Sequence, residues 1–447
     1  MIQALMLMAA LAQDQERARE LEKLQWLQER IVPPEVEEGW FVDYGIWFRP
    51  QYYAFRDGAG QRRSRQEHDA RPWLDLRYGG THSLYLRGRE RYEAWARGDS
   101  PVGEQREEDF DLDVGFYQLD LSRRTESGAA EPLGYLRLGR SYHKLGSGLT
   151  FNGLLDGAMA GWTLGPVRVT GLYGKTITDT DDLDQSRPNP AESRRWFAMA
   201  TLEVPLGSDW VPYFLGVTER DRNRESPHDP VQDYEWDAEY WGMGIRGVPA
   251  EGMTVLLEYV VNRGERFADL ATVVPEDIDA WAAVLEGVWF IGDSRLEAAL
   301  YVSSGDRDRL FAANTHLGNT QGTDDTAFVA FGFIPAGLVL NPLLTNIKVH
   351  KIGAFTRLIR PGGLFDAEDL EMGLEVFWFS KEDAGAVSDP FMDLSERKIG
   401  WEADLTADYA LFSDLSFTVR GGYFLPSEAP LFRGGRFFFL FSLVYSY

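Results

Sequence analysis

The sequence predicts an all-β fold, a single transmembrane antiparallel β-barrel of about 18 strands preceded by a short N-terminal helical segment. Three observations carry this prediction. Apolar and polar residues alternate over many stretches, short turns alternate with long polar connections, and the chain ends on an apolar, aromatic strand. Strands of a membrane barrel alternate lipid-facing and lumen-facing side chains, so these features are typical of that architecture.

Composition excludes several function classes. The 447 residues include 45 Lys and Arg against 70 Asp and Glu, which gives a net charge of −25. Nucleic-acid binding needs a clustered basic face, so we expect no nucleic-acid partner. No apolar run reaches the ~18 residues of a transmembrane helix. Because the chain has no Cys, disulfides, thiolate metal sites and cysteine nucleophiles are excluded.

Two segments precede the predicted barrel. Residues 1–12 are almost wholly apolar and carry the small-x-small pattern of a signal-peptidase site at Ala10 and Ala12, so we expect a short signal peptide. Residues 13–39 are expected to form a periplasmic helix and linker, because apolar residues recur at helical spacing over 14–31. Two alternatives stay open for this helix: a solvated tail, or contact with the barrel mouth or a periplasmic export component.

Period-two stretches dominate from Trp40 onward. In the first, Trp40, Val42 and Tyr44 fall on one face of the strand, and Asp43 and Arg49 fall on the other. Further strands are predicted at about 71–78, 83–94, 109–121, 134–142, 156–165, 166–177, 194–205, 209–219, 238–247, 252–263, 280–292, 294–304, 346–357, 369–380, 398–411, 414–425 and 435–447.

The connections between these strands sort by length. Turn-like ones, such as 79–82 and 292–293, alternate with long polar ones such as 56–70 and 305–345. Outer-membrane barrels are built in this way, with turns in the periplasm and loops outside. We therefore predict one barrel domain at 40–447 in a bacterial outer membrane, in contact with its lipid. We expect its longest loop, 305–345, at the surface, with an inward-folded constriction or plug as the alternative.

The last strand strengthens the membrane prediction. Phe437, Phe439 and Phe441 share one face, and the chain ends on Tyr447. As the edge strand of a soluble protein, this segment would be an aggregation hazard. Outward-facing tryptophans elsewhere would supply the interfacial girdles of a membrane barrel, although aromatic residues also fill the cores of soluble β-proteins.

Two parts of the chain resemble the alginate-export family. They are Tyr135–Arg140 with Leu155–Gly174, and Trp401–Leu411 with Leu415–Pro426. The resemblance implies a monomeric outer-membrane barrel of about 18 strands that passes an anionic exopolysaccharide.

Arginines recur on the predicted lumen face of the N-terminal half. Arg87, Arg89 and Arg91 occupy successive inward positions about 7 Å apart, and Arg77 lies on the adjacent strand. A ladder of planar guanidinium groups suits carboxylates, each held by forked hydrogen bonds and passed to the next. The predicted conduit residues are Arg77, Arg87, Arg89, Arg91, Arg137, Arg168 and Arg195.

Acidic residues gather on the predicted lumen face of the C-terminal half. They are Glu258, Glu286, Glu371, Glu375, Glu402 and Asp404. The arginines could serve as scaffold that pairs with these acids, or the two walls could set up the transverse field of a diffusion porin. A uronate exporter needs a net positive lumen, so a mixed lumen departs from the resemblance. Export of an anionic polysaccharide and diffusion of small solutes both stay open, with a sheath around another protein less favoured.

No motif indicates catalysis, so we expect neither an enzyme nor a cofactor. The six His are scattered, and neither a Gly-x-Ser-x-Gly nor a His-Glu-x-x-His pattern occurs. Asp179, Asp181 and Asp184 offer oxygens to Ca²⁺, but no EF-hand glycine follows them. A solvated acidic loop is the favoured interpretation, and we predict no metal site.

Overall fold

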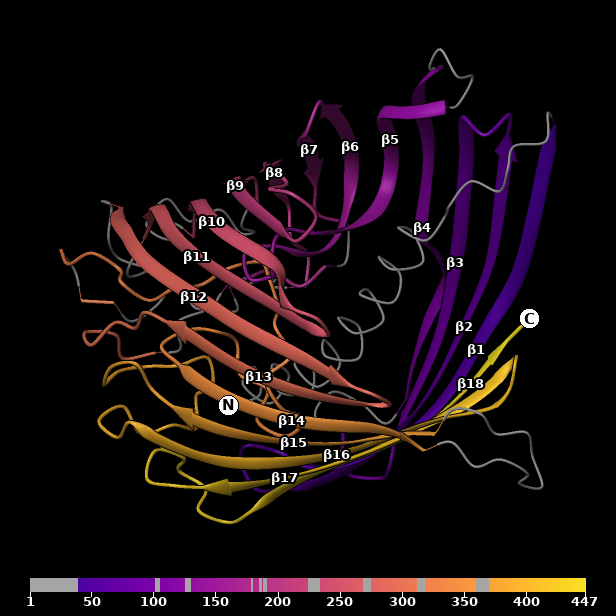
Figure 1. Ribbon diagram of the computed structural model, residues 1–447. Coiled ribbons are helices and arrows are strands. Elements are labelled where there is room, and N and C mark those ends of the chain that lie inside the picture. The colour runs from indigo at the N-terminus through magenta and orange to yellow at the C-terminus, as the bar shows by residue number, and fades with distance from the viewer. Residues whose placement is uncertain are drawn as a thin grey trace.

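Eighteen antiparallel strands close into one barrel (Figure 1), which confirms the predicted fold class. The computed structural model describes residues 39–100, 105–124, 130–177, 180–184, 187, 191–223, 234–267, 275–311, 319–320, 322–358 and 370–447. The expected signal peptide at 1–12, the helix over 14–31 and Asp179 lie outside the described residues. Within those ranges, no helix is long and apolar enough to cross a membrane.

The strand bounds are as follows. They are β1 (Trp40–Arg56), β2 (Arg62–Tyr78), β3 (His82–Trp95), β4 (Gln105–Arg124), β5 (Ala130–Lys144), β6 (Asn152–Leu164), β7 (Val167–Lys175), β8 (Arg195–Glu203), β9 (Trp210–Asp221), β10 (Trp236–Ala250), β11 (Met253–Arg266), β12 (Glu276–Ile291), β13 (Ser294–Ser303), β14 (Lys348–Leu358), β15 (Leu370–Ser380), β16 (Lys398–Phe412), β17 (Leu415–Pro426) and β18 (Arg436–Ser446).

Each strand pairs with its neighbours in sequence, and β18 pairs with β1 to close the barrel. At this seam Tyr52 lies opposite Phe441, and the Tyr447 N–H donates to the Ile46 carbonyl at 3.0 Å. Closure matters physically, because a lipid-exposed strand edge would leave backbone donors and acceptors without partners in hydrocarbon.

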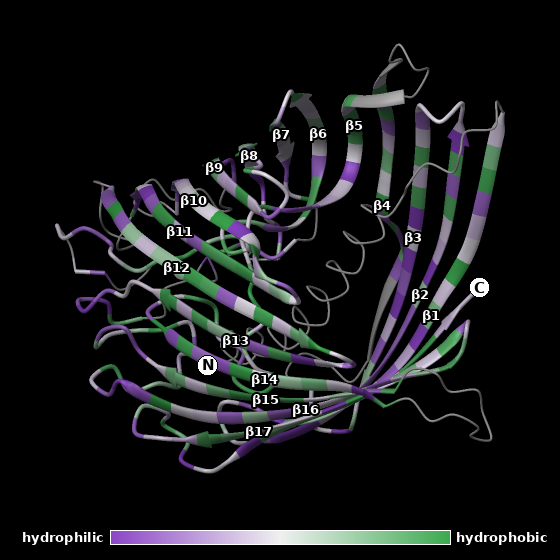
Figure 2. Cartoon of the chain, viewed as in Figure 1, coloured by the Kyte–Doolittle hydropathy of each residue, from purple (hydrophilic) through white to green (hydrophobic). Residues whose placement is uncertain are grey.

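Hydrophobic and hydrophilic residues alternate along the strands (Figure 2). On β10, for example, Trp241 and Met243 are exposed while Tyr240 is fully buried inside. The outward side chains form an exposed apolar surface that includes Trp162, Trp289 and Trp401. This surface suits lipid and explains how a chain of such mixed composition can span a membrane.

The first hairpin differs from the sequence prediction. Residues 62–70 belong to β2, so the connection between β1 and β2 is a short turn rather than a loop over 56–70. The segment looked like a loop because charged residues occupy its inward face and polar residues occupy much of its outward face. Arg65 and Asp69 on the inward face are nevertheless buried and form ion pairs within the lumen.

Candidate functional site

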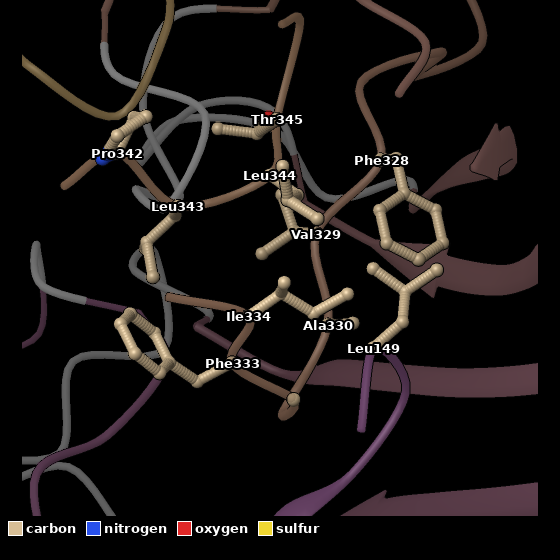
Figure 3. A pocket seen from close by; sticks show the side chains of 11 residues that line it. Leu149, Phe328, Val329, Ala330, Phe333, Ile334, Pro342, Leu343, Leu344 and Thr345 are labelled. Carbon is tan, nitrogen blue, oxygen red and sulfur yellow. The ribbon is translucent and has the colours of Figure 1, made fainter. Parts of the chain in front are cut away.

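The loop between β13 and β14 folds into the barrel from Asp325 onward. Phe328 and Ala336 in this loop are fully buried. On β10, the Tyr240 hydroxyl donates to the Val329 carbonyl at 2.8 Å. Phe331 forms an isolated parallel β-bridge with Phe151, which directly precedes β6. The apolar side chains of the loop gather around a small pocket with Leu149 (Figure 3). The part of the loop from Asp325 onward thus takes the inward-folded alternative, whereas Arg307, Leu310 and Phe311 at its start are exposed, as expected of a surface loop.

Two carboxylates on β16 hold this inward loop. The Leu338 N–H donates to Glu402 at 2.5 Å and to Asp404 at 2.9 Å. The N–H groups of Val339 and Leu340 donate to Glu402 at 2.7 and 2.9 Å. Both carboxylates are buried. Two residues of the predicted acidic wall, Glu402 and Asp404, thus hold the backbone of the loop. The alternation of inward and outward residues along the strand predicted that they face the lumen, but not this role.

Glu258 on β11 holds a second, shorter inward segment. It accepts hydrogen bonds from the Ser147 N–H at 2.9 Å, from the Ser147 hydroxyl at 2.6 Å and from the Tyr213 hydroxyl at 2.6 Å. The Phe333 N–H donates to the Gly148 carbonyl at 3.0 Å, which joins this segment to the long loop. The two loops therefore support each other inside the barrel.

The other predicted acidic residues have cationic or hydroxyl partners. Lys351 bridges Glu375 at 2.6 Å and Glu297 at 2.9 Å, and Arg295 pairs with Glu371 at 3.2 Å. Glu286 accepts a hydrogen bond from the Tyr301 hydroxyl at 2.9 Å. The C-terminal half of the lumen is thus a mixed surface rather than a continuous acidic wall.

Four arginines surround two aspartates on the inward face of β1 to β4, and we call this group the arginine cluster. Its members are Arg49, Arg71, Arg87, Arg89, Asp69 and Asp113. The Asp69 carboxylate pairs with Arg71 at 2.6 Å, Arg89 at 2.8 Å and Arg49 at 3.6 Å. Asp113 pairs with Arg87 and lies 3.9 Å from Arg71. Four positive and two negative charges leave a formal excess of +2.

An aromatic ring fixes part of this cluster. The guanidinium carbons of Arg49 and Arg71 each lie 4.8 Å from the ring centroid of Trp47. Cation–π contacts and fixed carboxylates hold planar donors in one orientation. Arg89 is the most exposed of the four, at 18% of its side chain.

The predicted conduit residues separate in the structure. Arg87 and Arg89 belong to the arginine cluster, and Arg91 lies opposite Asp69 in the β2–β3 register. Arg77 pairs with Asp75 on its own strand. Arg137 donates to Gln118, and Arg168 is exposed near the turn that joins β6 to β7.

Four members of the cluster, Arg49, Arg71, Asp69 and Asp113, are absent from the predicted conduit and acidic residues, and the pair of Arg49 with Asp69 shows why. Arg49 stood on the polar face of the first strand, but its partner Asp69 was placed in a loop. Only the β1–β2 register brings them together, since it sets Arg49 opposite Asp69. A shorter predicted turn after β1 would have supplied this signal.

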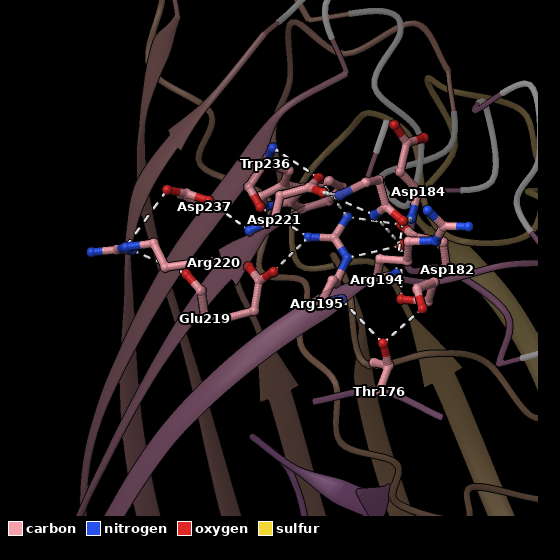
Figure 4. Close-up of polar contacts among 12 residues, drawn as sticks. Thr176, Asp182, Asp184, Arg194, Arg195, Glu219, Arg220, Asp221, Trp236 and Asp237 are labelled. Atoms are coloured by element: carbon pink, nitrogen blue, oxygen red, sulfur yellow. Dashed lines mark hydrogen bonds and ion pairs between the residues drawn. The ribbon is translucent and has the colours of Figure 1, made fainter. Parts of the chain in front are cut away.

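Arg195, which was predicted to line the conduit, does not lie with the other lumen arginines. It is fully buried between the start of β8 and the connection before it, where it pairs with Asp182 and Glu219 at 2.8 Å and with Asp221 at 3.3 Å (Figure 4). Burial alone would raise the pKa of Asp182, but Arg195 and Arg187 hold it well below its ordinary value. The group joins the connection over 176–194 to β9.

Among the described residues, no group of three or more His, Cys, Asp or Glu side chains could hold a metal ion. Of the three calcium candidates, Asp181 and Asp184 are described. Asp184 is buried, and its N–H donates to Asp182, a carboxylate that Arg195 already occupies.

A closed 18-stranded barrel with an apolar outer surface, a charged interior and an inward loop is the architecture of outer-membrane β-barrel proteins. Solved structures with this fold include three from Pseudomonas aeruginosa: OpdL, OccK8 (OprE) and OccK11 (OpdR). OpdL has a TM-score of 0.58 at 12% identity, with 91% of this chain and 98% of that chain covered. OccK8 has a TM-score of 0.55 at 10% identity, with 91% of this chain and 98% of that chain covered. OccK11 has a TM-score of 0.53 at 14% identity, with 92% of this chain and 98% of that chain covered. No protein-family model matches the sequence, and no curated protein matches it.

These structures share the fold, which confirms the predicted closed β-barrel of about 18 strands. They are porins of the Occ type, so the resemblance to the alginate-export family is wrong. The segments that suggested that family consist of Gly, Arg and alternating apolar residues, which a barrel of this size uses for geometric reasons that do not depend on family.

Proposed function

We propose that this chain is an outer-membrane channel through which small hydrophilic solutes diffuse, and that anionic solutes pass along the arginine cluster. The observation that carries the proposal is the excess of fixed guanidinium groups on one lumen wall. A cluster with a net positive charge raises the local concentration of anionic solutes. Forked donors also suit carboxylates.

Solvent exposure of charged residues supports a water-filled path on the turn side of the lumen. Arg295 and Glu371 have 31% and 32% of their side chains exposed, and Arg246 has 44%. Buried charges would be costly unless paired, so this exposure fits a hydrated vestibule. The inward loop narrows the lumen on the other side. Since one chain closes the barrel by itself, each monomer is a complete channel.

Replacing the four arginines of the cluster by glutamine tests the proposal. The formal charge of the cluster changes from +2 to −2, since only Asp69 and Asp113 remain charged. We expect the chloride-to-potassium permeability ratio to fall by about tenfold. The measurement is the reversal potential across a planar bilayer under a salt gradient.

Arg263→Gln provides the matched control, because Arg263 is half exposed on the outward face of β11 and pairs with Asp279. We expect this variant to keep the ion preference of the wild-type protein. A wild-type channel that prefers cations would contradict the anionic part of the proposal. A protein that forms no channel at all would contradict the proposal as a whole.

A further inference from the structure

The outer wall of the barrel carries an apolar groove across β7 to β11. The groove has a volume of about 430 Å³, and its lining includes Leu202, Phe214, Trp241, Met243 and Tyr259. Phe214, Trp241 and Met243 are exposed by 53%, 56% and 58%. These side chains point away from the lumen, so the groove opens toward the lipid.

Small residues in cross-strand register explain why the wall is hollow here. Gly171 on β7 lies opposite Ala200 on β8, and Ala200 lies opposite Gly216 on β9. A Cβ atom added to Gly171 would meet nothing within 4 Å. The row therefore leaves open space at Gly171, whereas the ring of Trp241 covers Gly216, with its nearest atom 3.0 Å from the position of an added Cβ.

Cationic residues lie directly on the loop side of this row. Lys175 and Arg220 stand four positions along β7 and β9 from Gly171 and Gly216, which is about 13 Å at the rise of a strand. Both flank the exposed Trp196 in the register. Arg194 beside them is 63% exposed. Arg220 pairs with Glu239 at 3.0 Å, and Arg194 lies 3.7 Å from the exposed Glu192. Lys175 therefore supplies most of the available charge, and Arg194 adds to it through its exposed guanidinium group.

We propose that this groove binds one acyl chain of a phosphorylated glycolipid of the lipid A type, with a phosphate against Lys175 and Arg194. The loop side of an outer-membrane barrel faces the outer leaflet. Half of a ~30 Å hydrocarbon core is about 15 Å. An acyl chain whose phosphorylated headgroup contacts the cationic residues therefore reaches the small residues near the membrane centre. The exposed Trp196 fits the headgroup level.

The test measures lipid retained on the detergent-purified protein by native mass spectrometry, after incubation with lipid A or with phosphatidylethanolamine. Ala200→Leu fills the groove, and Lys175→Ala removes a cation. We expect each variant to bind lipid A about tenfold more weakly, equivalent to ~1.4 kcal/mol. Ala354→Leu is the matched control, because Ala354 is an exposed outward alanine on β14, and we expect it to bind as the wild type does.

Three results would overturn the proposal. They are equal retention of phosphatidylethanolamine and lipid A, loss of lipid in Ala354→Leu as well as Ala200→Leu, and loss of a dimer instead of lipid in Ala200→Leu. The last result would assign the groove to a second copy of this chain. Bilayer conductance of the variants separates this outcome from the proposed function, since the groove lies outside the lumen and its loss should leave ion selectivity unchanged.

Discussion

Replacing Glu402 and Asp404 together by alanine is expected to raise single-channel conductance severalfold. The substitutions remove every carboxylate acceptor of the Leu338, Val339 and Leu340 N–H groups. A buried donor left without a partner costs about 1–3 kcal/mol. Three such donors destabilise the inward position of the loop enough for it to leave the lumen. Planar-bilayer recording measures the result directly.

Glu371→Ala serves as the control for this prediction. Glu371 also faces the lumen, but it is one-third exposed and pairs with Arg295 instead of the loop. We expect its loss to change ion preference slightly and conductance little. If the double variant folds into a barrel and conducts like the wild type, the two carboxylates are not the anchor of the loop.

Replacing Arg195 by methionine is expected to reduce the free energy of unfolding by about 3–5 kcal/mol, the cost of breaking a buried ion pair from one side. The change leaves Asp182, Glu219 and Asp221 buried around an uncharged side chain. The measurement is urea unfolding in detergent, followed by tryptophan fluorescence.

Arg220→Met is the matched control for Arg195, because the two arginines lie near each other. Arg220 is 40% exposed and pairs with Glu239 on the outer wall. An exposed pair of this kind contributes about 0–1 kcal/mol. The prediction fails if the two substitutions have the same cost.

The buried ion pairs of Arg195 also make the stability of the folded protein depend on pH. Because the pKa of Asp182 in the folded protein lies well below its ordinary value of 3.8, its contribution to stability is complete above that value. It is lost as the pH falls toward and through the folded-state pKa. Acid should therefore destabilise the wild-type protein more than Arg195→Met, and equal acid sensitivity of the two proteins would contradict this.

The barrel itself could be predicted from the sequence because the alternation of side chains between the two faces of a strand is a local property. Trp40 and Arg49 fall on opposite faces of one strand whatever the rest of the chain does. The approximate strand count followed from the same pattern. The charged start of β2 escaped detection because a strand that lines a polar lumen lacks the apolar face on which the prediction depends.

The inward loop and its partners could not be predicted in the same way. The run from Ala327 to Leu340 is largely apolar, which could have argued against a surface position. What it contacts depends on tertiary pairing, since Tyr240 lies 89 positions from its partner Val329 and Glu402 lies 63 positions from its partner Val339 along the chain. The arginine cluster likewise needed the β1–β2 register, whereas the buried position of Arg195 depends on a connection with no periodic pattern.

The pairing of β1 with β18 also constrains how the molecule is made. Trp47 pairs with Ser446, and 446 minus 47 is 399 positions along the chain. Contacts of such high sequence separation form late, after more local hairpins. Leu338 of the inward loop and Tyr53 beside this seam belong to one buried apolar cluster, so closure of the seam completes part of the packing around the loop. Loss of β18 would leave two unpaired edges during biogenesis, a state prone to aggregation and degradation.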